Sequence, residues 1–508
     1  MPASPVDSQA SEGYEMRSSK GRGNIVQRRH LTTDVLVVGN GGAGLRAAVA
    51  AAETGCQVII ASKIGSDRPN STAVIAGWGA AVQPEEAESY FRTVVEEGNY
   101  LSDQELAWSY AQEAAEQMPE LRRFGVEMRL DECALERPGT VRDLWYFPGP
   151  RGRLGDAIRK PLREAAASLG AVILDDTLVT RLLTSDSSVV GATALDLATG
   201  DLLVIAAKAV ILATGGASGL YARQNNPAGT TGDGFALAYR AGAELVDMEF
   251  DTFMMSQEEL EALFRGGLTD EQALSTAGAH YSCGGVKVDH NRCSRVDGLY
   301  AAGEVAGGTF GSARLGGSAV GDIVVSGCLA GQNAAAAAAR KGETTPEEEQ
   351  VMSEEERLTL MLGRDGTPPR ALREEVRALM WRKVGPVRRD AGLRAAVEEL
   401  PGLRTRAENM AANSLRELRD AIETDLMLDA AEVIAAAALA RTESRGAHWR
   451  LDHPVPDSEE WLRNIVISRG ADGTPTMRMA PVSMTRITSP GPCRIGTAWA
   501  GGYVGSEP

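Results

Sequence analysis

The chain has no net positive charge, few histidines and no long apolar run. Its 508 residues carry a formal net charge of −17 and five histidines. Nucleic acids and anionic membranes attract basic surfaces, so this charge argues against both as partners; it is compatible with a protein that has a basic docking surface. No apolar segment has the length of a signal-peptide core or a membrane span, so we expect a cytoplasmic protein without direct membrane insertion.

The cysteines are also few, and their spacing is uninformative for metals. The six cysteines include no CxxC pair and no spacing typical of an iron–sulfur ligand set. We therefore expect reduced thiols and no metal site in this chain. Any cluster that takes part in the function would belong to another subunit.

A strand–turn–helix–strand pattern is the strongest local signal that is present. The stretch TDVLVVGNGGAGLRAAVAAAETGCQVIIASK predicts a buried strand at 34–38, a helix from about 43 to 54 and a second strand at 57–61. Three glycines occupy the GxGxxG positions: Gly39, Gly41 and Gly44. Such a turn allows close backbone approach to a pyrophosphate at the helix N-terminus. The pattern predicts a dinucleotide-binding, Rossmann-like domain.

One position departs from the general dinucleotide pattern. The second strand ends in Ala61, Ser62 and Lys63, without the acidic residue that binds ribose hydroxyls. Either the cofactor is held differently, or another segment supplies the carboxylate.

Two further strands end in residues suited to a nucleotide. KAVILATGG ends in Thr214 and Gly215, and DGLYAAGEVAG places Glu304 at the end of a third strand, where it is a candidate for the missing carboxylate. Between them, Asp233 stands in a Gly-Asp-Gly turn before an alanine-rich helix and is expected as its N-cap. These strand ends predict one sheet with one ligand across its carboxyl edge.

A lone arginine lies in the small-residue stretch GTFGSARLGGSAVGD, residues 308–322. Glycines there allow the backbone to approach a ligand, and the guanidinium of Arg314 suits a carboxylate or phosphate. From this stretch alone, a surface loop with an incidental charge explains the pattern equally well.

Seven motifs follow one another between about residues 32 and 467. In chain order they are GNGGAG, SKIGSDRPNSTAVIAGWGAAV, ATGG, TGDG, HYSCGGV, GLYAAGEVAGGTFGSARLGGSAV and ARTESRGAHWRLDHPVPDSEEWLRN. Together they resemble the flavoprotein subunit family of succinate dehydrogenase and fumarate reductase. That family also contains L-aspartate oxidase and the α subunit of adenylylsulfate reductase. The resemblance covers most of the chain.

The resemblance implies FAD as the cofactor. The positions implied to hold it are Gly39, Gly41, Gly42, Ala43, Gly44, Ser62, Lys63, Ser71, Thr72, Gly77, Thr214, Gly215, Asp233, Glu304, Ala319 and Val320. Family members typically have serine and lysine after the second strand, which accounts for the missing acid. Respiratory members carry a histidine-linked flavin in the STAVIAG region. This chain has Asn70, Ser71 and Thr72 there, as aspartate oxidase does, so non-covalent FAD is expected.

The resemblance also implies two catalytic residues. Arg314 falls on the arginine that clamps a substrate carboxylate beside the flavin, and His280 of HYSCGGV falls on a second substrate-binding residue. Without the resemblance, His280 would be interpreted as a hydrogen-bonded core histidine.

The chain departs from the family pattern next to this site. Met254 and Met255 follow MEF where the family has a polar His-Pro-Thr triplet, and methionines favour packing or an apolar ligand surface. Only residues 251–279 remain where the family inserts a capping domain that carries a proton-transfer arginine. Arg265 and His290 are the candidates to replace it. An uncapped site favours a larger substrate, a lid from another chain or a changed reaction.

The predicted fold is α/β, with a shortened cap and a C-terminal helical domain. The expected segments are a disordered tail at 1–30, FAD-binding segments at 31–250 and 280–340, the cap at 251–279, a helical domain at 341–467 and a tail at 468–508. Four residues at helical spacing, Leu415, Leu418, Ile422 and Leu426, are expected in the core of the helical domain. The resemblance brings Glu443, Arg445 and His448 toward a subunit interface and the edge of the active site.

Three functions are consistent with the sequence. The first is an FAD-dependent dehydrogenase, reductase or amino-acid oxidase that moves a hydride between flavin N5 and a small carboxylate held by Arg314. The second is an electron-transfer subunit with an iron–sulfur partner, similar to adenylylsulfate reductase. The third is a flavoprotein that has lost catalysis and serves as a structural partner. We favour the first, with either an iron–sulfur or a lid-forming protein as partner.

Overall fold

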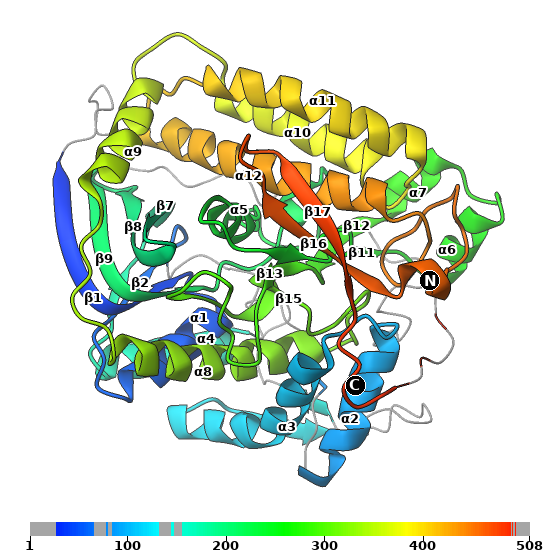
Figure 1. The fold of residues 1–508 in the computed structure, drawn as a ribbon, viewed down its shortest axis with the longest axis horizontal. Helices are drawn as coiled ribbons and strands as arrows, with labels where there is room; N and C mark the ends of the chain where they lie inside the picture. The colour runs from blue at the N-terminus through cyan, green and yellow to red at the C-terminus, as the bar shows by residue number, and fades with distance from the viewer. Residues whose placement is uncertain are drawn as a thin grey trace, which may run out of the picture.

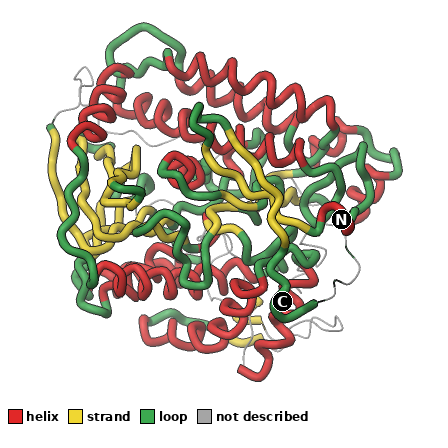
Figure 2. The backbone as a smooth tube through the Cα atoms, viewed as in Figure 1, coloured by secondary structure: helices red, strands yellow, loops and turns green. Residues whose placement is uncertain are grey.

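The computed structural model describes residues 27–65, 78–79, 84–131, 144–146, 155–488, 490 and 493. Figures 1 and 2 show strands between two groups of helices, with α1, α3, α4 and α8 on one side and the bundle α10–α12 on the other. The arrangement is α/β, as predicted.

The largest sheet has seven strands in the order β6-β2-β1-β9-β8-β7, with β14 paired to β9. Its strands are β1 (Arg28–Val38), β2 (Val58–Ala61), β6 (Val172–Leu174), β7 (Thr177–Ser185), β8 (Ser188–Asp196), β9 (Leu202–Leu212) and β14 (Leu299–Ala301). Strands β6, β2, β1, β9 and β14 are parallel, whereas β7 and β8 continue the sheet antiparallel. The three strand ends that the sequence predicted to share one sheet, those of β1, β9 and β14, therefore do so.

Small residues pack two helices tightly beside this sheet. Helix α1 (Gly42–Ala52) is rich in alanine, and α8 (Ser318–Ala338) crosses it at two glycines. A Cβ at Gly327 would lie 2.6 Å from the Ala43 carbonyl oxygen, and one at Gly331 would lie 2.3 Å from that of Ala47. Helices α2 (Ala87–Glu97), α3 (Gln104–Glu120) and α4 (Asp156–Ser168) complete this layer.

A second sheet has five strands, in the order β15-β13-β10-β16-β17. Its strands are β10 (Leu245–Val246), β13 (Gly285–Lys287), β15 (Ala306–Gly307), β16 (Arg463–Arg469) and β17 (Pro475–Pro481). Helix α5 (Asp233–Arg240) leads into β10. A separate small sheet joins β3 (Trp78–Gly79), β5 (Leu144–Tyr146) and β4 (Arg129–Asp131).

Residues 251–279 form a compact excursion between two paired strands, β11 (Asp251–Met254) and β12 (Gly278–Ser282). It contains α6 (Gln257–Phe264) and α7 (Asp270–Thr276). Both helices begin with a capping box, from Ser256 and from Thr269, which satisfies the first backbone N–H groups of each helix.

The C-terminal helices are α9 (Glu348–Met361), α10 (Pro369–Lys383), α11 (Asp390–Glu408), α12 (Leu415–Ala440) and the short α13 (Ser458–Trp461). Figure 1 shows α10, α11 and α12 side by side. Leu418, Ile422 and Leu426 are fully buried, as predicted, whereas Leu415 is half-buried at the helix start.

The structure corrects three local expectations. Strand β1 begins at Arg28, so residues 28–30 pair with β9 instead of belonging to a disordered tail. Residues 463–469 form a strand, not the end of a helical segment, and 475–481 pair with it where only a tail was expected. Local pattern failed there because β16 pairs with β10, which is distant in sequence, and β17 in turn pairs with β16.

No helix within the described ranges is long and apolar enough to cross a membrane. The same residues bring together no group of three or more histidine, cysteine, aspartate or glutamate side chains that could hold a metal ion.

Candidate active site

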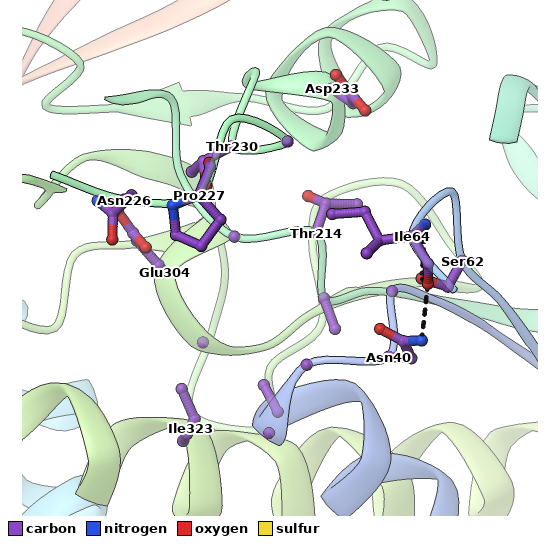
Figure 3. A pocket seen from close by; sticks show the side chains of 18 of the residues that line it. Asn40, Ser62, Ile64, Thr214, Asn226, Pro227, Thr230, Asp233, Glu304 and Ile323 are labelled. Atoms are coloured by element: carbon purple, nitrogen blue, oxygen red, sulfur yellow. Dashed lines mark hydrogen bonds between the residues drawn. The ribbon is translucent and has the colours of Figure 1, made fainter. Parts of the chain in front are cut away.

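The carboxyl ends of β1, β2, β9 and β14 open into one elongated cavity of about 440 Å³. Ligands of open α/β sheets bind at this edge. Figure 3 shows Asn226, Pro227 and Glu304 toward one end of the cavity and Asn40, Ser62 and Ile64 toward the other.

The glycine turn after β1 has the geometry that a dinucleotide requires. Gly39 has φ +113°, and a Cβ there would lie 2.3 Å from the Ala213 carbonyl oxygen. A Cβ at Gly44 would lie 2.0 Å from the Gly39 carbonyl oxygen, so only glycine allows the helix to pack this closely against the turn. Gly44 itself does not line the cavity. Helix α1 has Gly41 as N-cap, which has no side chain to cap the first turn, and that turn contains no acidic residue. Its positive end therefore favours an anion in the cavity.

A second helix also directs its N-terminus at the cavity. Helix α8 has Gly317 as N-cap, and its first-turn residues Ala319 and Val320 line the cavity. Thr214 lines it from the end of β9, and its hydroxyl is buried without a partner among the described residues. Buried hydroxyls in native proteins are normally satisfied, so this one has hydrogen-bonding capacity for a ligand. Two uncapped helix ends and an unsatisfied hydroxyl fit a long anionic ligand such as a dinucleotide.

Lys63, at the end of β2, has carboxylate partners on both sides. Its Nζ lies 2.6 Å from Asp233 Oδ2 and 2.9 Å from Glu423 Oε1. Thr231 joins the group by accepting from Lys63 and donating to Asp233 Oδ1 at 2.6 Å. Asp233 is therefore not the N-cap that the sequence predicted; the N-cap of α5 is Gly232, and the Asp233 side chain turns to Lys63 instead.

Glu423 brings the helical bundle to this end of the cavity. It lies in α12 and is 1% exposed, with Arg373 of α10 as a further partner at 2.9 Å. Burial acts to raise the pKa of Glu423, but the charges of Lys63, Arg419 and Arg373 hold it below its ordinary value. Glu423 is therefore a fixed anion behind Lys63.

Arg314 lies at the other end and is 5% exposed. Its guanidinium donates to the Leu315 carbonyl at 3.0 Å and approaches His280 Nε2 at 3.4 Å. It also stacks over the Tyr281 ring at 4.4 Å, a cation–π contact that fixes its plane. Its Nε is buried with no hydrogen-bond partner among the described residues. The arginine is thus positioned and retains donors for an anionic ligand.

His280 is held in one tautomer. Its Nδ1 lies 3.0 Å from Asn225 Oδ1, an oxygen that only accepts, so Nδ1 carries the proton and Nε2 accepts from Arg314. Burial and the charge of Arg314 lower the pKa of His280 to about 4. At neutral pH the ring is an uncharged acceptor that orients Arg314.

Glu304 lines the cavity next to this pair. Its Oε1 accepts the backbone N–H of Ser282 at 3.0 Å. Gly216 makes room for it, since a Cβ at that residue would lie 2.1 Å from the same oxygen. Burial raises the pKa of Glu304 to about 7, so the carboxyl group changes charge close to neutral pH.

Two family models match the sequence. The model described as FAD binding domain matches residues 34–273 and 266–320, and that described as fumarate reductase flavoprotein C-term matches 373–494. The first spans more than half of the chain.

The chain belongs to the flavoprotein family of fumarate reductase and succinate dehydrogenase.

Curated relatives and solved structures agree with this assignment. The chain is 28% identical to a fumarate reductase (CoM/CoB) subunit of Methanothermobacter marburgensis over 86% of this chain and 97% of the relative. It is 29% identical to the L-aspartate oxidase of Mycobacterium bovis over 86% and 95%. A quinol fumarate reductase chain of E. coli superposes with a TM-score of 0.81 at 25% identity, covering 92% of this chain and 99% of that one. The protein is an FAD-dependent oxidoreductase of this family.

The cavity brings together most of the residues that the family resemblance assigned to FAD. Those that line it are Gly39, Gly41, Gly42, Ala43, Ser62, Lys63, Thr214, Gly215, Asp233, Glu304, Ala319 and Val320, with Arg314 and His280 at one end. Asn70, Ser71, Thr72 and Gly77 lie outside the described residues. Their part in this flavoprotein stays a prediction.

Neither candidate for the proton-transfer residue reaches the cavity of this family member. Arg265 is paired with Glu261 at 2.8 Å, and its side chain is 77% exposed. His290 is exposed in the turn between β13 and β14. Both are exposed and neither lines the cavity, so their part as proton-transfer candidates stays a prediction.

The TESRGAH segment lies inside the molecule instead of at an exposed interface. Glu443, Arg445 and His448 are at most 1% exposed, and Glu443 pairs with Arg445 at 2.7 Å. The segment supports the Arg314 loop from behind, because Ala447 N–H donates to the Ser312 carbonyl at 2.9 Å. Within this chain the segment therefore packs against the loop that carries Arg314.

Several lining residues were missed by sequence reasoning: Asn40, Asn225, Asn226, Pro227, Thr230, Tyr281 and Ile323. Asn225, Asn226 and Pro227 belong to QNNPAG, whose composition indicates a loop and says nothing of which cavity the loop lines. Its position between the ATGG and TGDG motifs, which both contribute lining residues, was the sequence signal that could have placed it at the cavity.

Proposed function

We propose that this flavoprotein oxidises or reduces a small carboxylate-bearing substrate, with Arg314 as its carboxylate clamp. The observation that carries the proposal is Arg314, fixed by His280 and Tyr281 with free donors in a cavity whose other end suits a dinucleotide. Bound FAD supplies hydride transfer at flavin N5. Arg314 binds and orients the carboxylate, and His280 keeps the guanidinium in place as a neutral acceptor.

FAD in this protein is proposed to be non-covalent. The support is the presence of Asn70, Ser71 and Thr72 in the region where respiratory members carry the flavin-linked histidine. Acid precipitation of the holoprotein should leave the flavin in the supernatant. Flavin fluorescence that stays with the denatured polypeptide would contradict this.

The cap is proposed to be shortened. Only α6 and α7 lie between β11 and β12, and the FAD-domain model matches in two stretches that meet there. A substrate larger than a C4 acid, or a lid from a partner protein, suits such a site. Neither Arg265 nor His290 lines the cavity, so neither is proposed as the proton-transfer residue.

The experiment is anaerobic flavin bleaching against succinate, aspartate, other amino and hydroxy acids, and sulfite with AMP. We expect one carboxylate class to bleach the flavin. Arg314→Ala should lower kcat/KM for it on the order of tenfold to hundredfold, because a well-ordered charged hydrogen-bond pair is worth about 1.5 to 3 kcal/mol. Arg265→Ala is the matched control, since that arginine is exposed and outside the cavity, and it should behave as wild type.

A second candidate is an electron-transfer subunit with an iron–sulfur partner. It is favoured by the match of residues 373–494 to the fumarate reductase C-terminal model and by a relative named as one subunit of a fumarate reductase. Absence of bleaching by every carboxylate, with copurification of a stoichiometric iron–sulfur protein, would favour it. Rapid reoxidation of reduced flavin by oxygen would instead favour an oxidase, and a flavin that no substrate can reduce would favour a non-catalytic partner.

A further inference from the structure

Met254 and His280 lie on paired strands and both line the cavity. Met254 of β11 pairs with Gly278 of β12, two residues before His280. The register of the two strands shifts at His280, between the pairs Thr252–Tyr281 and Phe253–Ala279, which is typical of a β-bulge that re-aims a side chain. The thioether and the imidazole therefore reach the same cavity from neighbouring strands.

This end of the cavity has charge for one carboxylate. Among the described residues that line the cavity, the cationic side chains are Arg314 and Lys63. Lys63 is already paired with Asp233 and Glu423 at the other end. Next to Arg314 lies the carboxyl group of Glu304. Against the described lining residues, a second substrate carboxylate would be desolvated next to an acid and without a free cation, which is costly.

The walls next to the clamp are apolar. Met254 and Pro227 line the cavity there, and the Tyr281 ring is covered by the Arg314 guanidinium. A methionine side chain is flexible and polarizable, so it adapts to aliphatic or aromatic groups of different shape. An apolar group attached to the bound carboxylate would be removed from water against these side chains.

We propose that the site selects monocarboxylates whose apolar portion lies against Met254 and Pro227, and discriminates against dicarboxylates of the same length. This inference rests on the proposed function, because it takes Arg314 as the carboxylate clamp. Met254 is the specificity-determining residue in it.

The test uses the FAD-loaded full-length protein and the absorbance change of its flavin on ligand binding. Acetate, butyrate and hexanoate are titrated, followed by succinate and adipate as the length-matched diacids. A buried CH₂ contributes about 0.8 kcal/mol, so each added methylene should tighten binding about threefold to fourfold until the wall is covered. Each dicarboxylate should bind at least about tenfold more weakly than the monocarboxylate of its length.

Met254→Gln keeps the length of the side chain and makes the wall polar. It should reduce the ratio of hexanoate to acetate affinity about tenfold, on the order of two methylenes' worth of contact. Met352→Gln is the matched control, because Met352 lies on α9 with 57% exposure, and its ratio should equal that of wild type. If Met254→Gln does not fold, the affinities of the wild-type protein for the monocarboxylates and dicarboxylates still test the proposed selectivity.

The outcomes separate the two ideas. This inference would be overturned if dicarboxylates bound as tightly as the matched monocarboxylates, or if affinity did not depend on chain length. The proposed function would still stand in that case, provided that carboxylate binding depended on Arg314. Carboxylate binding that is unaffected by Arg314→Ala would overturn both.

Discussion

Asn225 Oδ1 lies 3.0 Å from His280 Nδ1, and Arg314 Nη2 lies 3.4 Å from His280 Nε2. The first contact gives the ring an acceptor at one nitrogen, and the second gives it a cation at the other. The first places a proton on Nδ1, and the second disfavours a further proton on Nε2, so together they select the neutral ring with the proton on Nδ1. At this scale, therefore, the amide of Asn225 decides how His280 acts toward Arg314.

Replacing Asn225 with aspartate should charge His280. A carboxylate at Nδ1 stabilises the imidazolium, so the pKa of His280 should rise from about 4 to above its ordinary value. Histidine-ring NMR titration measures this directly, and five histidines make assignment practical. Asn291→Asp next to the exposed His290 is the control and should shift the pKa of that ring only slightly. A pKa of His280 that stays near 4 in Asn225→Asp would show that Asn225 does not set its charge.

In the native sequence, the lowered pKa of His280 makes the free energy of unfolding depend on pH. The unfolded His280 binds a proton below about pH 6.5, whereas the folded ring binds one only below about pH 4. The unfolded state therefore gains stability between these values, and the contribution of His280 to folding is lost as the pH falls from about 6.5 to about 4.

At the scale of elements, the strand–turn–helix unit at the start of the fold was predictable because its signals are local. The alternation of buried strand, glycine turn and alanine-rich helix predicted β1, α1 and β2 to within a few residues, except for the start of β1. The edge strand β17 was not predictable, because its residues are mostly exposed and show no alternation of buried and exposed positions. The segment is a strand through its pairing with β16.

Gly44→Ala tests the turn. Its new Cβ would overlap the Gly39 carbonyl oxygen at 2.0 Å, so the turn must shift and FAD affinity should fall by at least about tenfold, with a destabilisation of about 1 to 3 kcal/mol. Flavin content after dialysis and denaturant unfolding are the measurements. Gly402→Ala, in α11 with no atom within 4 Å of the added Cβ among the described residues, is the control. It should stabilise the protein by about 0.5 to 1 kcal/mol; equal behaviour of the two variants would rule out close packing at Gly44.

At the scale of the whole molecule, the Lys63–Glu423 ion pair joins the first nucleotide-binding unit to a helix more than 350 residues away in sequence. Arg373 of α10 adds a second link through the same carboxylate. The helical bundle is therefore part of the wall behind the cofactor cavity.

Glu423→Gln should destabilise the folded protein by about 3 to 5 kcal/mol, because it removes one partner of a buried ionic group. It should also weaken FAD binding, since Lys63 loses one of the two carboxylates that position it. Denaturant unfolding of the apoprotein and an FAD titration measure the two effects. Glu375→Gln makes the same change in an exposed pair with Arg406 of the same bundle and should leave both quantities unchanged. Similar results for both variants would refute the link between bundle and cavity.

The sequence by itself determined the cofactor unit and supplied the candidate for the carboxylate clamp. Glycine spacing, apolar runs and ordered motifs are local, and they located the dinucleotide turn, Arg314 and His280. Only the tertiary structure decided what those residues contact. The Asp233 side chain pairs with Lys63 instead of capping its helix. Arg265 and His290 do not line the cavity, whereas Met254 and His280 both do. The physical reason is that strand register, burial and charge pairing depend on segments far apart in the chain, whereas sequence patterns report only on neighbours.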